Sequence, residues 1–473
     1  MSSEKAQLMV IGAGPGGYAA AFMAADLGVN VTLVDPEPNP GGVCLYRGCI
    51  PSKALLHIAQ LIIDNRTSED IGITFGEPEI FPKKIKAWKD QVVDQLTGGL
   101  GQLSKHRKIN RIRGKAHFVD NKTLTVNDKE YTFDNCILAT GTLPATLPGQ
   151  TFESDKIWDS TDALALDDIP DSMLVVGGGY IGLELGYVYA ALGCKVSLVE
   201  MTSGLLPGMD RDLVSVLTKK IKPFFKDISL DTKVSSIEPT KQQVKVELEN
   251  KNGKKKENFK TVFVAIGRKA NISPLKLENT DIETDNNDFI KVDEQLRTSI
   301  PNIFAIGDMT GQPFLAHRAT HQGRIAAEVV SGKNVIYDPA VIPAVIYSQP
   351  EIATCGLSET EAKEEGIDIE ISKFPWAASG RSLTMGKKEG MTKLIIDPST
   401  ERILGAGIVG PYAGELIGEA AVAVEMAAQA NDLGLTVHPH PTLSETLMEA
   451  ANAWYGTSTH IYRPKRKAKR REK

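Results

Sequence analysis

Two segments of this chain repeat the same glycine pattern at a constant spacing of 165 residues. The first is LMVIGAGPGGYAAAFMAADLGVNVTLVD, which ends at Asp35, and the second is LVVGGGYIGLELGYVYAALGCKVSLVE, which ends at Glu200. Each copy has a short apolar run, a GxGxxG turn, a small-residue segment and a second apolar run, and an acid follows the first glycine by 23 residues. This order predicts a strand, a tight turn, a helix and a parallel strand in each copy.

Each glycine of the motif has its own physical task. The first permits a tight turn, the second lets the backbone approach a pyrophosphate at the positive end of the helix, and the third lets helix and strand pack closely. The final carboxylate accepts hydrogen bonds from an adenosine ribose. One GxGxxG is a weak signal, but two copies in full context predict two dinucleotide-binding domains. The matched pairs are Gly12 with Gly177, Gly14 with Gly179, Gly17 with Gly182 and Gly28 with Gly193.

The acid of the second copy also predicts its coenzyme. Glu200 would repel the 2′-phosphate of NADP, and the next residues, Met201, Thr202 and Ser203, supply no arginine to neutralise it. The second site is therefore expected to prefer NAD.

The remaining sequence completes an α/β plan. A length of 473 residues predicts two to four compact domains. Alternating β-rich sequence follows each glycine-rich unit, over 112–140 and 233–267, and Asn252-Gly253 is a hairpin signal. From about residue 343, strand-like runs precede an alanine-rich helix near 413–430 and a shorter helix from about 443. The expected fold is α/β, with two Rossmann-like domains and a C-terminal α+β domain.

Composition excludes several classes of protein. Charged residues make up 24% and apolar residues 42%, and no apolar stretch approaches 18 residues, which excludes a disordered chain and a membrane bundle. The glycines of GAGPGG also interrupt the apolar run that a signal peptide would need, so we expect a cytoplasmic protein. Residues 463–473 carry +7 of a net charge of −5, which leaves −12 elsewhere and argues against general nucleic-acid binding. We interpret this basic tail as a solubilising terminus, with contact to an acidic partner as the alternative.

Two of the five cysteines lie close together, in GVCLYRGCIPSK. Gly48 permits a bend between Cys44 and Cys49, and Pro51 suits the first turn of a helix. Cys49 would then lie at a helix N-terminus, where the dipole stabilises a thiolate, with Lys53 on the same face. A zinc half-site or two buried thiols are the alternatives, but zinc needs two more ligands and no second cysteine pair exists. We therefore predict a redox disulfide and no metal.

A candidate acid–base group lies in HPHPTLSE, residues 438–445. His440 precedes a proline that restricts the backbone, and Glu445 is close enough to orient its imidazole across a turn. Thr442 or Ser444 would cap the following helix. The alternative is a structural turn with a satisfied histidine. His317 and His321 are interpreted as exposed or structural.

These motifs together resemble one enzyme family. GAGPGG, GGVCLxxGCIPSKALL, ATG, GGGxIGLE, AIGR, FAIGD, FPWAASGR and HxHPTLSE occur over about residues 6–460, and the set is similar to the flavin-dependent pyridine nucleotide–disulfide oxidoreductases. The resemblance implies FAD in the first glycine-rich unit, NAD in the second, and a homodimer. It also implies oxidation of dihydrolipoamide, carried by the lipoyl domains and core acyltransferase of 2-oxo-acid dehydrogenase complexes, without membrane or nucleic-acid partners.

The resemblance implies roles for individual residues. Lys53 would lie near flavin N5 and pair with Glu184, Asp308 would contact the flavin ribityl chain, and Ala316 would lie near the isoalloxazine. His440, oriented by Glu445, would reach Cys44 and Cys49 of the partner subunit. The implied flavin-site residues are Gly12, Gly14, Gly17, Asp35, Gly42, Lys53, Gly114, Thr140, Gly141, Asp308 and Ala316. The implied NAD-site residues are Gly177, Gly179, Tyr180, Gly182, Glu200, Val234, Ala265, Gly267 and Arg268.

The implied domains are 1–145 and 269–342 for FAD, 146–268 for NAD, 343–460 for dimerisation, and 461–473 as the basic tail. Two positions depart from the family pattern. Tyr46-Arg47 replaces a small pair such as Asn-Val and adds a cation that we expect to shift the thiol pKa. Tyr180 stands where aliphatic residues are common, and resembles the tyrosine that covers the flavin in glutathione reductase.

The sequence leaves three other functions open: two related enzymes and a non-catalytic scaffold. Glutathione reductase would favour cations where Glu200 stands, and mercuric ion reductase would need a C-terminal cysteine pair, whereas the last cysteine is Cys355. A non-catalytic scaffold that binds nucleic acid through residues 463–473 would not need the redox pair or the HxHP segment.

Overall fold

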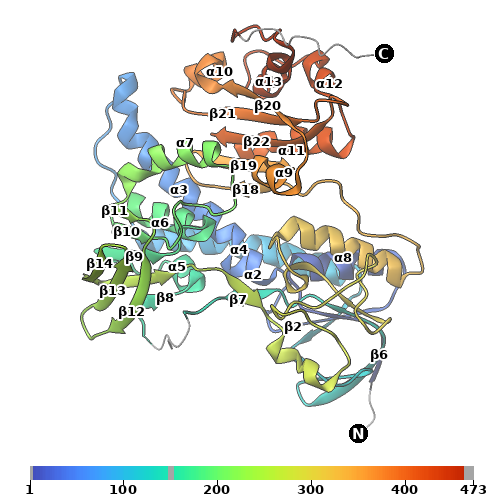
Figure 1. The fold of residues 1–473 in the computed structure, drawn as a ribbon. Helices are drawn as coiled ribbons and strands as arrows, with labels where there is room; N and C mark the ends of the chain where they lie inside the picture. Colours follow the sequence, from blue (N-terminus) through green and yellow to red (C-terminus); the bar gives the residue numbers. More distant parts are fainter. Residues whose placement is uncertain (1–3, 148–153, 463–473) are drawn as a thin grey trace, which may run out of the picture. The chain divides into compact units, whose positions relative to one another are not determined.

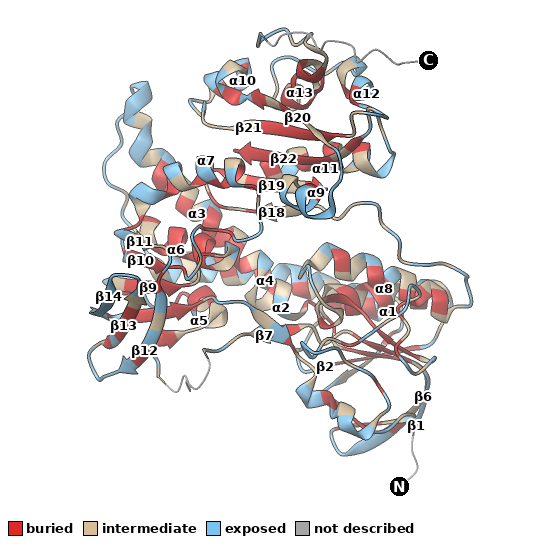
Figure 2. Cartoon of the chain, in the orientation of Figure 1, coloured by how far each residue is buried: buried red, intermediate tan, exposed pale blue. Residues whose placement is uncertain are grey.

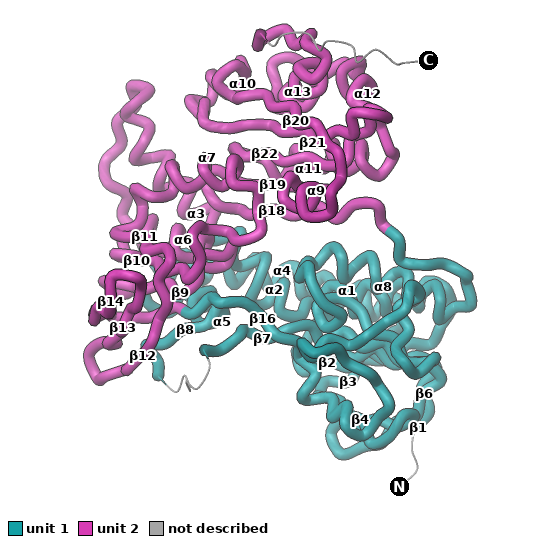
Figure 3. The backbone as a smooth tube through the Cα atoms, viewed as in Figure 1, with its two compact units in different colours: residues 1–55, 81–168, 264–338 teal, residues 56–80, 169–263, 339–473 magenta. Residues whose placement is uncertain are grey.

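The structure is a computed structural model that describes residues 4–147 and 154–462, so the predicted basic tail 463–473 lies outside the described residues. The chain forms two compact units (Figures 1 and 3). Unit 1 comprises residues 1–55, 81–168 and 264–338, and unit 2 comprises residues 56–80, 169–263 and 339–473. In the described residues, no helix is long and apolar enough to cross a bilayer.

Unit 1 is built on a mixed sheet in the order β3-β2-β1-β6-β5-β4, with β17 paired to β6. The pairs β1–β2, β2–β3, β1–β6 and β6–β17 are parallel, whereas β4–β5 and β5–β6 are antiparallel. This confirms the parallel core and the β-rich segment expected over 112–140. The strands are β1 (Glu4–Ile11), β2 (Val31–Asp35), β3 (Asn110–Arg113), β4 (Ala116–Asp120), β5 (Thr123–Val126), β6 (Lys129–Leu138) and β17 (Ile303–Ala305).

Helices cover this sheet. Two of them, α1 and α8, pack against each other. Their approach is close at Gly323, where a Cβ would lie 2.3 Å from the carbonyl oxygen of Gly16. A 25-residue helix, α4, is also present, although no sequence motif had indicated it. The helices and small strands are α1 (Pro15–Asp26), α2 (Gly42–Arg47), α3 (Cys49–Thr67, which continues into unit 2), α4 (Pro82–His106), β7 (Thr142–Pro144), β8 (Ile157–Trp158), α5 (Ser160–Ala165), β16 (Arg268–Ala270) and α8 (Ala316–Val330).

Unit 2 contains the second glycine-rich repeat. Its strands include the run β11-β10-β9-β15, in which the pairs β10–β11 and β9–β10 are parallel, and α6 has the same 12-residue length as α1. A three-stranded antiparallel sheet, β12-β13-β14, follows. The elements are β9 (Ser172–Val176), α6 (Tyr180–Ala191), β10 (Lys195–Val199), α7 (Arg211–Ile221), β11 (Asp227–Ser229), β12 (Lys233–Pro239), β13 (Val244–Asn250), β14 (Gly253–Phe259) and β15 (Thr261–Val264).

The predicted hairpin at Asn252-Gly253 is present, but its turn lies one residue earlier. Asn250 pairs with Gly253, so the two connecting residues are Lys251 and Asn252. Gly253 has φ +114° and opens β14, because only glycine readily adopts that conformation where the strand starts.

The C-terminal part of unit 2 is an antiparallel sheet in the order β18-β19-β22-β21-β20. Figure 2 shows β21 and β22 as largely buried. The α+β character expected from residue 343 is thus confirmed. The elements are β18 (Ala344–Ile346), β19 (Glu351–Gly356), α9 (Glu359–Glu365), β20 (Glu370–Pro375), α10 (Gly380–Thr384), β21 (Met391–Ile396), β22 (Ile403–Gly410), α11 (Ala413–Glu425), α12 (Ala430–Leu435) and α13 (Glu445–Tyr455).

Candidate active site

The two glycine-rich turns have the same backbone geometry. The first glycine of each, Gly12 and Gly177, has φ +99° and +109°, a region open to glycine. A Cβ on the third glycine would lie 1.8 Å from the Gly12 oxygen in α1, and 2.1 Å from the Gly177 oxygen in α6, so helix and turn touch directly. The predicted repeat is therefore reproduced down to single contacts.

Space lies open above the start of each helix. A Cβ on Gly179 would meet no atom within 4 Å, and a Cβ on Gly14 would meet only the Cα of Gly42, at 4.0 Å. Both glycines precede the first helical residue, where unpaired N–H groups and the helix dipole favour a phosphate. Both turns therefore fit a dinucleotide pyrophosphate.

The two strand-end acids are held by equivalent donors. Asp35 accepts hydrogen bonds from the amide of Ala13 at 2.6 Å and from the amide of Glu37 at 2.8 Å. Glu200 accepts from the amide of Gly178 at 2.7 Å and from that of Thr202 at 2.8 Å. These amides orient each carboxylate at the end of its strand, beside its glycine turn.

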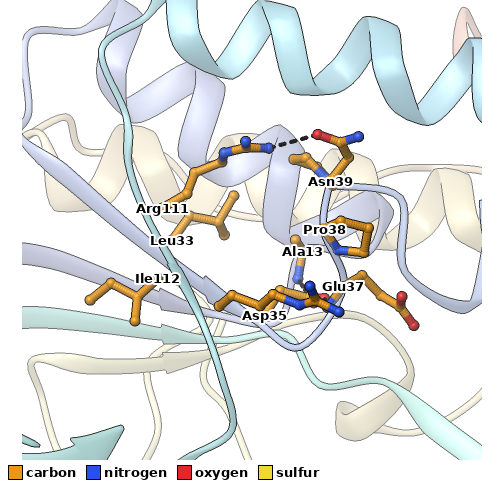
Figure 4. A pocket seen from close by; sticks show the side chains of 10 residues that line it. Ala13, Leu33, Asp35, Glu37, Pro38, Asn39, Arg111 and Ile112 are labelled. Atoms are coloured by element: carbon orange, nitrogen blue, oxygen red, sulfur yellow. Dashed lines mark hydrogen bonds between the residues drawn. The ribbon is translucent and has the colours of Figure 1, made fainter. Parts of the chain in front are cut away.

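A pocket opens beside the Asp35 carboxylate (Figure 4). Arg111 spans it and donates to the Asn39 side chain at 3.0 Å. Burial raises the pKa of Asp35 to about 6, although the Ala13 amide and the Arg47 cation oppose this shift. The pocket presents the carboxylate that would accept hydrogen bonds from an adenosine ribose. Its lining is Ala13, Leu33, Asp35, Glu37, Pro38, Asn39, Pro40, Arg111, Ile112 and Arg113.

The unusual Tyr46-Arg47 pair faces this pocket loop. Arg47 forms an ion pair with Glu37, and the Tyr46 hydroxyl donates to the carbonyl of Asn39 at 3.1 Å. We expected the Arg47 cation to shift the thiol pKa. Lys53 lowers the pKa of Cys44 and Arg47 lowers that of Asp35, while the effect of Arg47 on the thiols stays a prediction.

Cys44 and Cys49 lie together as free thiols. Cys49 is the first residue of α3, as predicted, and Cys44 lies in α2. A hydrogen bond with the Cys49 side chain, assisted by burial, raises the pKa of the Cys44 thiol far above its ordinary value, although Lys53 opposes the shift. Cys49 lies at the N-terminus of α3, where the helix dipole favours a thiolate.

A second polar cluster in unit 1 joins the ATG and FAIGD segments. Thr142 donates to Asp308 at 3.0 Å, and Arg268 donates to the Thr142 hydroxyl at 2.7 Å. Burial raises the pKa of Asp308, although Thr142 and Arg268 oppose that shift. Nearby, Thr140 donates to the carbonyl of Asn271, whose buried side-chain oxygen has no hydrogen-bond partner. An unsatisfied buried acceptor beside a buried carboxylate fits a site that takes a polar ligand.

His440 and Glu445 form the expected pair. His440 Nδ1 lies 2.9 Å from the Glu445 carboxylate, and 69% of the histidine side chain is exposed. Burial of Glu445 opposes its ionisation, but the Thr442 amide and His440 outweigh that effect and keep the pKa of Glu445 below its usual value. With Nδ1 donating to the carboxylate, Nε2 of a neutral His440 is the basic nitrogen.

The capping prediction for the next helix is only half correct. Ser444 stands at the N-cap of α13, but its hydroxyl makes no capping hydrogen bond. The Ser444 hydroxyl instead lies 2.9 Å from that of Thr442, while Glu445 accepts the Thr442 amide at 2.7 Å. The carboxylate that orients His440 therefore also secures the start of the helix.

The other expected site residues lie in varied settings. Glu184 is buried and accepts the amide of Tyr347 at 2.9 Å, while the Tyr180 side chain is 42% exposed at the first position of α6. The expected pairs Lys53–Glu184 and His440–Cys44 each join residues of different units and remain predictions. His317 and His321 are exposed, as expected. Of the rest, Gly42 opens α2, Gly114 donates to the Asp35 carbonyl, Ala316 opens α8, Val234 lies in β12, Ala265 and Gly267 follow β15, and Gly141 has φ +68°.

Three features were missed by sequence reasoning. Burial raises the pKa of Tyr18 most, and negative charge on Cys44 and Cys49 raises it further. This α1 residue is therefore a neighbour of the two thiols. Lys393 is fully buried among Asp210, Asp212 and Glu359. His438 is bound by Glu419. Only HPHP, two histidines in alternation with proline, gave a sequence signal for any of these.

Comparison with known proteins agrees with this geometry. Residues 6–323 match the family model for pyridine nucleotide-disulphide oxidoreductases, and residues 342–451 match that family's dimerisation domain. A dihydrolipoyl dehydrogenase of Vibrio cholerae is 47% identical over 100% of both chains, and one of Haemophilus influenzae is 46% identical over 99% of each.

A solved structure is also similar over the whole length. The Cu(II) complex of the HOCl-induced flavoprotein disulfide reductase RclA from Escherichia coli has a TM-score of 0.84 at 28% identity, and the match covers 96% of this chain and 99% of that one. The chain therefore belongs to the pyridine nucleotide-disulphide oxidoreductase family, and its full-length relatives are dihydrolipoyl dehydrogenases.

Proposed function

We propose that this enzyme oxidises dihydrolipoamide to lipoamide and reduces NAD⁺. The observation that carries the proposal is the pair of neighbouring free thiols, Cys44 and Cys49, of which Cys49 begins a helix, in a chain that also presents a carboxylate-bound His440. In the proposed reaction, a substrate thiolate attacks Sγ of Cys44 in a Cys44–Cys49 disulfide. That bond breaks, Cys49 leaves as a thiolate, and His440 has accepted the proton of the attacking thiol.

The second substrate thiol completes the exchange. It attacks the substrate sulfur of the mixed disulfide, so cyclic lipoamide leaves and its proton goes to Cys44, whose raised pKa retains it. The substrate has then lost two electrons, and the cysteine pair has gained them. FAD held by the first glycine-rich unit would supply the two-electron acceptor and hydride donor that connects the dithiol with NAD⁺. The Lys53 cation stabilises negative charge on the thiol pair. Glu445 keeps His440 in the tautomer whose Nε2 accepts a proton.

We assign FAD to the first glycine-rich unit, with Asp35 at the adenosine ribose and Asp308 at the ribityl chain. NAD belongs at the second, where Glu200 meets the ribose and Tyr180 covers the nicotinamide pocket. We further propose the domain limits 1–145 and 269–342 for FAD, 146–268 for NAD and 343–460 for dimerisation. The enzyme acts as a cytoplasmic homodimer on lipoyl domains of 2-oxo-acid dehydrogenase complexes.

The test compares two dithiol–coenzyme pairs on the purified flavoprotein. NAD⁺ reduction by dihydrolipoamide is measured beside NADPH oxidation by glutathione disulfide, and we expect activity with the first pair. A faster second reaction would make the protein a glutathione reductase.

A cysteine variant tests the thiol assignment in the same assay. Cys44→Ser should abolish dihydrolipoamide turnover and keep bound flavin, with long-wavelength absorbance from the remaining Cys49 thiolate. Cys355→Ala, which removes a buried thiol from β19, is the matched control and should stay active. Full turnover by Cys44→Ser would refute the assignment.

A further inference from the structure

His438 lies two residues before His440 in the same loop, but its ring has a different environment. Its side chain is 5% exposed, compared with 69% for His440. Nδ1 of His438 lies 2.9 Å from the carbonyl oxygen of Thr436, and Nε2 lies 2.7 Å from the carboxylate of Glu419, on α11. Both ring nitrogens therefore face oxygen atoms from two different segments.

The partners dictate the charge of this ring. A carbonyl oxygen only accepts hydrogen bonds, and so does an ionised carboxylate. A neutral imidazole has one donor, so one of the two contacts would bring two acceptors together in a buried place, which costs about 1–3 kcal/mol. The imidazolium form has two donors and satisfies both partners.

The surrounding charges also favour a cation. Helix α11 carries Glu415, Glu419 and Glu425 as its titratable side chains, and α12, which leads into the loop, carries Asp432. Neither helix carries a lysine or arginine. The other titratable pair near the loop is His440 with Glu445, and these two side chains contact each other through Nδ1 of His440.

We propose that His438 is a positioning residue, held as an imidazolium between Thr436 and Glu419, which fixes the loop that presents His440. Pro439 and Pro441 restrict φ on either side of His440, so a clamp at position 438 leaves the base little freedom to swing. The inference rests on the proposed role of His440 as the base for dihydrolipoamide.

A neutral alternative makes the opposite prediction for one variant. If Glu419 were protonated, a neutral His438 would accept its proton, and Glu419→Gln would preserve that contact because an amide N–H also donates. If His438 is the cation, Glu419→Gln removes the charge that stabilises its second proton, so the ring should become singly protonated while the carboxamide keeps a hydrogen bond to it.

The experiment uses the flavin-loaded enzyme with His438→Gln, Glu419→Gln, the double variant, and His321→Gln as a control, since His321 is an exposed histidine of unit 1. Two reactions are followed: NAD⁺ reduction by dihydrolipoamide, which needs the base, and ferricyanide reduction by NADH, which does not. A misplaced reacting group costs up to about 100-fold, so we expect kcat for the dithiol to fall about 10- to 100-fold, with KM nearly unchanged. The ferricyanide reaction and the control should be unaffected.

The double variant and a spectroscopic measurement complete the test. Because both substitutions change the same His438–Glu419 contact, the double variant should be no slower than the slower single variant. In ¹⁵N-histidine NMR at neutral pH, the signal lost in His438→Gln should be that of a ring protonated at both nitrogens. This readout does not depend on any activity, so it survives if dihydrolipoamide proves not to be the substrate.

Several outcomes would overturn the proposal. A fully active His438→Gln enzyme would refute the positioning role, and an equal loss in both reactions would mean that His438 only maintains the fold. A singly protonated ring in the NMR spectrum would refute the charge. If His438→Gln fails to fold, the NMR spectra of wild type and Glu419→Gln still decide between the two forms, because the doubly protonated ring signal should be present in the first and absent from the second.

Discussion

At the scale of single residues, the two repeats differ in the acid that ends the strand. Asp35 and Glu200 accept hydrogen bonds from equivalent backbone amides, which orient each carboxylate. The remaining lone pairs of each carboxylate can accept hydrogen bonds from a ribose. Glu200 is 7% exposed, and a 2′-phosphate beside this buried charge would be repelled. The identity of the acid was readable from the sequence, but its two amide partners became visible only in the fold.

Glu200 should set the coenzyme preference. Glu200→Ala removes the repulsion and the hydrogen-bond acceptor, so the ratio of kcat/KM for NAD⁺ over NADP⁺ should fall by about 10- to 100-fold, as expected for about 1–3 kcal/mol. Glu200→Gln keeps the acceptor without the charge and should give an intermediate ratio. A wild-type preference for NADP⁺ would contradict this assignment.

Asp35 should make stability depend on pH. Its folded pKa of about 6 lies above the ordinary 3.8, so the unfolded chain releases this proton first as the pH rises. The free energy of unfolding of wild type, relative to Asp35→Asn, should fall between pH 3.8 and about 6. Denaturant titrations of both proteins at equal flavin content measure the difference, which should approach about 3 kcal/mol. Parallel pH curves would show that Asp35 ionises normally.

At the scale of elements, a buried charge cluster joins three segments of unit 2. Lys393 on β21 donates to Asp210 at 2.6 Å, to Asp212 at 3.0 Å and to Glu359 at 2.9 Å. Asp210 also accepts the Glu359 amide at 3.3 Å, so the starts of α7 and α9 are joined through one carboxylate. Burial opposes the charge on both Lys393 and Asp212, but their hydrogen bonds prevail, raising the pKa of Lys393 and lowering that of Asp212.

Removing the central cation should be costly. Lys393→Met leaves three carboxylates facing one another and should lower the free energy of unfolding by about 3–5 kcal/mol. Lys373 contacts the same Asp212 and Glu359, but is 40% exposed, so Lys373→Met should cost less than about 1 kcal/mol. Because the pKa of Asp212 is depressed, the wild-type advantage should be lost as the pH falls through that value. Equal costs for the two variants would contradict the role of burial.

At the scale of the whole molecule, the matched dimerisation domain, residues 342–451, contains His440 but not Cys44 or Cys49. In the resembling family, the histidine of one subunit serves the thiols of the other. A separated chain would then hold a thiol pair without its base.

Subunit exchange tests this arrangement. A His440→Ala chain and a Cys44→Ser chain are each expected to be inactive, with a loss of about 10²- to 10⁴-fold for the missing base. One of the two sites in each mixed dimer combines an intact Cys44 with an intact His440, so mixing should restore activity. Mass spectrometry verifies the exchange. Mixed dimers without activity would mean that His440 serves its own subunit.

The sequence by itself determined the features that depend on local spacing. The two βαβ units, the strands at 391–396 and 403–410, the start of a helix at Cys49 and the His440–Glu445 pair all follow from glycine positions, periodicity and short separations. Each of these is decided by contacts within a few residues or within one repeat.

Only the tertiary structure decided where distant charges meet. Lys393 resembles a surface lysine in the sequence, and its partners lie 34 to 183 residues away. Arg47 was expected to act on the thiols, yet it pairs with Glu37 because the pocket loop brings that carboxylate closer. His438 is 19 residues from Glu419, and their contact depends on how α11 packs beside the loop. Long side chains choose partners in space, so their roles, unlike those of glycine turns, depend on the folded arrangement of whole elements.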